Sequence, residues 1–176
     1  MEINEKIILL AIGICAALIW FFFFKNPKKI HLRQLLQMGI LLEERGEAFY
    51  HSLSERSLNP DVKDLCEKLA QAEHKHKELI EETLSHWLDL PMSEFSRSQI
   101  DSELHKKGLF LNPPSLDATE KILLKYAVEQ EYKSVDFYAG FEKEFPEAWK
   151  TMHVERLVME EKDHAARLTD LLSKIQ

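Results

Sequence analysis

Two short motifs of glutamate and histidine recur in this chain with spacing that could hold metal ions. Each is a Glu-x-x-His motif, and each follows another glutamate by thirty residues. A three-residue step is close to one helical turn, so both side chains of a motif can contact the same ion. Carboxylate oxygens together with imidazole nitrogens suit iron or manganese, and four carboxylates balance two divalent ions. The candidate ligands are Glu43, Glu73, His76, Glu131, Glu161 and His164.

The two sets of candidate ligands belong to an internal repeat. At an offset of 88 residues the two halves of the chain align glutamate on glutamate and histidine on histidine. Tyr50 and Tyr138 also align, each seven residues after a candidate ligand, which is nearly the same face of a helix. Acidic faces that carry histidines by coincidence are the alternative, but coincidence does not explain the shared register. We interpret the repeat as a duplicated helical hairpin.

The elements that must position these residues are predicted to be helices. Apolar residues recur at three- and four-residue steps from residue 31 onward. We expect long helices over about 31–58, 60–88, 117–145 and 146–173, and a connection over 89–116 that holds a short helix near 93–106. Asn59 and Pro60 fit the start of the second helix, and Asp117 with Glu120 fits a capping box for the third.

This pattern predicts an all-α, ferritin-like four-helix bundle made of two antiparallel hairpins with a long crossover. We expect the crossover to bring the start of the second hairpin to the same end of the bundle as the start of the first. Within the site, we expect Glu43 and Glu131 to contact or bridge the ions and each Glu-x-x-His pair to hold mainly one ion. Glu47 is the first candidate for an additional contact, Glu160 is expected to contribute little, and His74 is expected to face solvent.

The first thirty residues differ from the rest of the chain. Ile7–Phe24 is an apolar run of 18 residues, long enough as a helix to cover roughly 27 Å at about 1.5 Å per residue. Basic residues follow it, whereas a basic start and a small-residue cleavage site are lacking, so a retained anchor is favoured over a cleaved signal peptide. We therefore predict a transmembrane anchor over 1–30 and a diiron domain over 31–176. The basic flank predicts a single-pass inner-membrane protein with its domain in the cytoplasm.

Composition excludes several other classes. The chain has 176 residues and a net charge of −7, which argues against a general nucleic-acid binder. Residues 1–30 carry four lysines and two glutamates, so the remaining residues carry −9. The two cysteines, Cys15 and Cys66, cannot form a four-cysteine metal site or a disulfide framework.

The segments EERGEAFY, EHKH, EYKSVDFY and EEKDH resemble the rubrerythrin branch of the ferritin-like diiron superfamily across residues 31–176. The resemblance implies two iron ions on the six candidate ligands, with manganese as the alternative, and places Tyr50 and Tyr138 as hydrogen-bond partners near the metals. Family members react ferrous iron with oxygen or hydrogen peroxide. The chain departs from the family where an extra carboxylate is expected, since Ser134 and its counterpart Gly46 stand there, and the rubredoxin domain is absent.

Three functions remain open from the sequence. The first is a membrane-anchored diiron oxidoreductase that oxidises ferrous iron with oxygen or hydrogen peroxide, supplied with electrons by an external donor. The second is a non-catalytic protein that binds iron and delivers it to a membrane partner. The third is a structural tether that needs no metal. The sequence leaves the oligomeric state open, a homodimer included.

Overall fold

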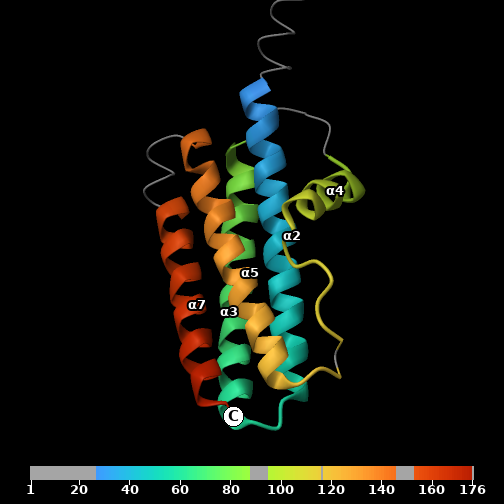
Figure 1. Ribbon diagram of the computed structural model, residues 1–176. Helices are drawn as coiled ribbons and strands as arrows, with labels where there is room; N and C mark the ends of the chain where they lie inside the picture. The colour runs from blue at the N-terminus through green and yellow to red at the C-terminus, as the bar shows by residue number, and fades with distance from the viewer. Residues whose placement is uncertain (1–26, 88–94, 116, 146–152, 176) are drawn as a thin grey trace, which may run out of the picture.

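The computed structural model describes residues 27–87, 95–115, 117–145 and 153–175, and these residues form a helical bundle (Figure 1). Four long helices make the bundle: α2 (Pro27–Arg56), α3 (Pro60–Trp87), α5 (Glu120–Phe141) and α7 (Glu155–Lys174). A shorter helix, α4 (Arg97–Lys107), lies beside α2, and a 3₁₀ turn, η1 (Glu142–Glu144), follows α5. The described residues contain no strand, which confirms the all-helical class.

The predicted membrane segment, residues 7–24, lies outside the described residues. Among the helices that are described, none combines the length and the apolar character needed to cross a bilayer. The predicted start of the fourth helix at Pro146 also lies outside them.

The crossover runs in the direction opposite to the one expected. In Figure 1, α2 starts at the upper end of the bundle and α5 starts at the lower end, with the connection running down the side between them. The expectation that both hairpins start at one end was therefore wrong. Because the connection runs the length of the bundle, α2 and α5 are antiparallel. Residues that follow the ligand on α2 therefore lie beside the ligand on α5, and residues that follow the ligand on α5 lie beside the ligand on α2.

Local sequence correctly predicts the start of α3 but not the start of α5. The Asn59 side chain accepts hydrogen bonds from the backbone N–H groups of Asp61 at 2.9 Å and Val62 at 3.5 Å, so it caps α3 as predicted. The predicted capping box at Asp117 was wrong, because α5 begins at Glu120 after Thr119. Glu120 instead accepts a hydrogen bond from Ser57 in the loop between α2 and α3. A tertiary contact thus takes the side chain that the motif would have used.

The short helix in the crossover fits its sequence and fastens the connection to the bundle. Ser96 and Gln99 form a reciprocal capping box at its start, and Gly108 ends it in the left-handed conformation at φ 70°. Arg45 on α2 pairs with Asp101 on α4 and donates to the Leu109 carbonyl at 3.3 Å. These contacts hold the crossover against one face of the bundle.

Two separate apolar clusters fill the bundle, one toward each end. One contains Leu36, Leu42 and Ile80, and the other contains Leu53 and Leu69. Each long helix passes from one cluster to the other, and a candidate ligand lies in between on every helix. The site is therefore a polar layer enclosed by apolar packing on both sides, where water is excluded and unpaired charges are costly.

Candidate metal centre

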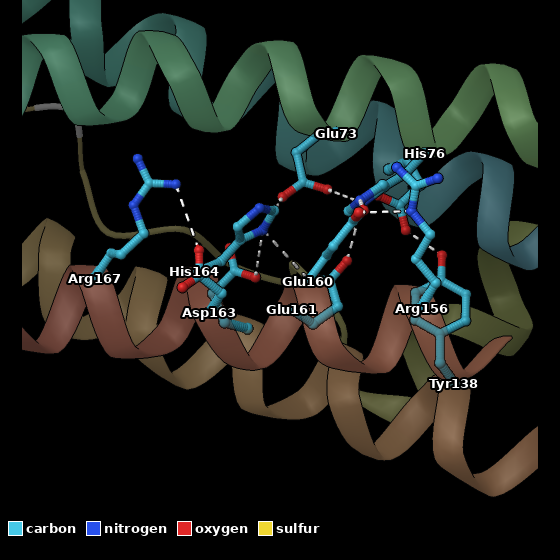
Figure 2. Close-up of polar contacts among 11 residues, drawn as sticks. Glu73, His76, Tyr138, Arg156, Glu160, Glu161, Asp163, His164 and Arg167 are labelled. Atoms are coloured by element: carbon cyan, nitrogen blue, oxygen red, sulfur yellow. Dashed lines mark hydrogen bonds and ion pairs between the residues drawn. The ribbon is translucent and has the colours of Figure 1, made fainter. Parts of the chain in front are cut away.

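The six predicted ligands meet in the middle of the bundle. Figure 2 labels the two Glu-x-x-His pairs among them, Glu73 with His76 and Glu161 with His164. Each of the four helices contributes, and no side chain of the six exposes more than 5% of its surface. The donor atoms form two overlapping groups, within each of which all atoms lie within 4.8 Å of one another. The first group is Glu43, Glu73, His76 and Glu161, and the second is Glu73, Glu131, Glu161 and His164.

The two donor groups share residues other than the ones expected to lie between the ions, and the expected roles stay a prediction. Glu73 and Glu161 belong to both groups, whereas Glu43 and Glu131 each belong to one. If two ions were bound, Glu73 and Glu161 could contact both of them, whereas Glu43 and Glu131 could each contact one. The reason is topological: α3 and α7 place their motifs at the centre of the layer, and α2 and α5 place one glutamate each at its flanks.

Both histidines direct the same nitrogen toward the carboxylates. Nδ1 of His76 lies 3.2 Å from Glu161 and 3.4 Å from Glu43, and Nδ1 of His164 lies 3.5 Å from Glu73 and 3.6 Å from Glu131. Figure 2 shows these rings turned toward the glutamates from opposite helices.

The buried donor atoms fit metal ions well. In the described part of the chain, five atoms of the predicted ligands are buried without a hydrogen-bond partner. They are Glu43 Oε2, Glu131 Oε2, Glu161 Oε1, His76 Nδ1 and His164 Nδ1. Buried polar atoms are nearly always satisfied, so such a cluster of inward-facing donors calls for an ion. The mixture of carboxylate and imidazole suits iron or manganese.

The two tyrosines bind the flanking glutamates reciprocally. Tyr50 on α2 donates to Glu131 on α5, and Tyr138 on α5 donates to Glu43 on α2. Both hydroxyls are buried, and burial raises the pKa of Tyr50 and of Tyr138 well above the usual value, so they stay protonated donors. Each tyrosine fixes one oxygen of its glutamate and leaves the other free to face the site.

Without metal, the layer retains protons at neutral pH. Burial, aided by the nearby Glu73, raises the pKa of Glu43 to about 8, and burial among other carboxylates raises that of Glu161 well above its usual range. Burial opposes charge on His164, but contact with Glu131 and Glu73 prevails and raises its pKa to about 9. Burial also opposes charge on Glu73, but contacts with Glu43 and with both histidines lower its pKa. Protons thus neutralise the site where metal would otherwise do so.

Two neighbouring glutamates differ from the sequence expectation. Glu47 was expected to add a contact to the metal site, but its carboxylate pairs with Lys77 at 2.7 Å and with His74 at 2.9 Å, away from the ligands. Glu160 was expected to contribute little, yet its Oε2 lies 2.7 Å from Nε2 of His76. His74 is about half exposed, as expected. In the sequence, the feature that could have indicated this contact is the position of Glu160 next to Glu161. From that position on α7 its side chain reaches His76 on α3.

The structure gives a reason for glycine at position 46, one of the two positions where the sequence departs from the rubrerythrin pattern. A Cβ at this position would lie 3.2 Å from Cγ of Glu73 and 3.3 Å from its carboxyl carbon. Glycine therefore leaves the space that the central carboxylate occupies. Its repeat counterpart, Ser134, is also buried beside the layer.

Comparisons with known proteins agree with this geometry. The chain matches the Rubrerythrin family over residues 34–111, which covers α2 from residue 34 onward, α3, α4 and the first half of the site. The fold is similar to the crystal structure of a DUF305 fragment from Deinococcus radiodurans, with a TM-score of 0.61 and 13% identity over 81% of this chain and 95% of that one. No match to a curated protein sequence was found. These findings show an all-helical domain that is similar to rubrerythrin over residues 34–111 and has buried groups that could bind metal.

Proposed function

We propose that this protein is a diiron oxidoreductase that oxidises ferrous iron with oxygen or hydrogen peroxide. The observation that supports it most is the pair of overlapping donor groups that share Glu73 and Glu161. These residues would hold two ferrous ions close together, which would allow a two-electron reaction. Reduction of hydrogen peroxide to two waters takes two electrons and two protons, and two ferrous ions held here would supply the electrons.

The protein's own residues prepare this site in three ways. Tyr138 and Tyr50 hold the flanking glutamates in fixed orientations through buried hydrogen bonds. Apolar clusters pack against the layer from both ends of the bundle. Burial raises the pKa of both tyrosine hydroxyls well above the usual value, so they keep their protons and these hydrogen bonds at neutral pH.

A non-catalytic role in iron binding and delivery is the second candidate. Gly46 and Ser134 favour it, because neither can supply the extra carboxylate that the rubrerythrin resemblance implies for efficient peroxide reduction. In either role we propose that residues 7–24 anchor the domain at the cytoplasmic side of the inner membrane, on the basis of their length and basic flank.

One experiment separates the two functions. The full chain is loaded with ferrous iron without oxygen, mixed rapidly with hydrogen peroxide, and followed by the near-ultraviolet absorbance of ferric iron. The oxidoreductase should reach full absorbance in a single turnover and keep its iron, whereas Glu161→Gln should not. A delivery protein should instead oxidise no faster than free ferrous iron and release its iron to a ferrous chelator. Glu155→Gln, an exposed glutamate on the same helix, is the matched control.

A further inference from the structure

A groove between α3 and α7 opens onto the histidine side of the site. Its volume is about 540 Å³, and both His76 and His164 line it. Four basic side chains, Lys68, Lys75, Arg156 and Arg167, also line it, and in the described part of the chain Glu160 is the sole carboxylate that does so. A basic groove is unexpected on a domain whose net charge is −9, and it favours an anionic ligand.

The two histidines differ in what holds their outer nitrogen. Nε2 of His76 contacts Glu160 at 2.7 Å, and Arg156 in turn donates to Glu160 at 2.7 Å (Figure 2). His164 is equally buried, with 5% of its side chain exposed, but no described residue pairs with its Nε2. When a histidine binds metal through Nδ1, Nε2 carries a proton and normally donates it to an acceptor.

The repeat explains why this acceptor is missing. At the offset of 88 residues, Glu160 corresponds to Ala72 and Arg156 corresponds to Lys68. Ala72 lies on the wall of the same groove. The first half of the chain thus provides the basic residue but not the carboxylate that would complete the symmetrical arrangement around His164.

Charge remains available in the groove beside His164. Lys75 forms no ion pair with any residue in the ranges that the structure describes. Arg167, one turn after His164, has only a 3.6 Å contact with Asp163. Lys68 and Arg156 are each engaged at 2.7 Å by an acid on their own helix. Lys75 and Arg167 are therefore the two least engaged cations of the groove, and both are available to hold an anion at the place where the second half uses Glu160.

We propose that this groove binds a small tetrahedral oxyanion, of the class of sulfate and phosphate, which accepts the Nε2 proton of His164 and is held by Lys75 and Arg167. The proposal rests on the proposed metal site, because metal at Nδ1 places the proton on Nε2. The anion would serve as the acceptor for Nε2 of His164, as the Glu160 carboxylate serves as the acceptor for Nε2 of His76.

The test is calorimetric titration of inorganic sulfate, a weak ligand for metals, into the full chain loaded with ferrous iron without oxygen at low ionic strength. Wild-type protein should bind about one sulfate per chain. Ala72→Glu supplies the missing carboxylate, so it should weaken sulfate binding by about tenfold or more and keep its iron. Lys75→Ala and Arg167→Gln should each weaken binding severalfold, whereas Lys63→Ala, at an exposed lysine on α3, should not.

Iron content measured on the same samples separates the possible failures. Wild-type protein that holds no iron overturns the proposed metal function before sulfate is added. Wild-type protein that holds iron but binds no sulfate overturns the groove proposal alone. Equal sulfate affinity in wild type, Lys75→Ala and Arg167→Gln also overturns it, and this outcome can be read even where Ala72→Glu does not fold.

Discussion

Tyr50 on α2 donates a hydrogen bond to Glu131 on α5, in the other half of the repeat. Tyr138 and Glu43 make the same contact in reverse. This reciprocal pairing requires antiparallel helices, because on each helix the tyrosine seven residues after the glutamate must lie beside the glutamate of the other helix. The pairing therefore links the path of the crossover directly to the chemistry of the site.

Removal of one tyrosine hydroxyl should weaken one half of the metal site. In Tyr50→Phe, a buried oxygen of Glu131 loses its donor, which should cost about 1–3 kcal/mol of stability. The second donor group should lose metal affinity, and the first should be affected less, because Glu131 belongs only to the second. Thermal unfolding and anaerobic iron titration measure both effects. Tyr132→Phe, at an exposed tyrosine on α5 next to Glu131, is the control; an equal loss in both variants would contradict the role assigned to Tyr50.

Glu160→Ala should weaken the first donor group through His76. The imidazole loses the carboxylate that orients it, and such outer partners typically contribute about 10–100-fold in metal affinity. The effect should be smaller than that of Glu161→Ala, which removes a direct ligand of both groups. Competition against a ferrous chelator measures the affinities. Unchanged affinity in Glu160→Ala would show that the 2.7 Å contact with His76 is dispensable.

Gly46→Ala should displace the central carboxylate. The added methyl group would lie 3.2 Å from Cγ of Glu73, so the side chain must shift and both donor groups should lose affinity. Gly140→Ala is a matched helical control, because no atom lies within 4 Å of its added methyl. It should be neutral or stabilise the protein by up to about 1 kcal/mol. Equal iron content in both variants would contradict a close approach at Gly46.

Metal-free protein should lose stability as the pH rises from about 4.5 to 9. Glu43 has a folded-state pKa of about 8 against 4.5 unfolded, and His164 has about 9 against 6.5, so the folded state holds more protons in this interval. Stability is then full below the unfolded pKa values and falls as pH rises through the folded ones. Metal binding must release these protons, so iron affinity should rise over the same interval. Denaturant melts and titration in two buffers of different ionisation enthalpy test both statements; stability that rises with pH in the metal-free protein would contradict them.

The sequence predicted the helices from short-range periodicity and the six-residue cluster from the 88-residue repeat. The 88-residue repeat placed Glu43 and Glu131 at equivalent positions, and the structure brings them into one layer with both Glu-x-x-His motifs. Their role as ligands stays a prediction. The direction of the crossover, the loss of the capping box at Asp117 and the contact of Glu160 with His76 all depend on distant packing, which periodicity does not encode.

The central claim is that the polar layer binds two iron ions, and anaerobic titration of ferrous iron with metal counted by plasma mass spectrometry tests it most directly. The wild-type chain should hold two ions. Glu43→Ala and Glu131→Ala should each hold about one, because each glutamate belongs to one donor group, and Glu161→Ala should hold fewer than either. A wild-type chain that binds no iron, or variants that all retain two ions, would contradict the account.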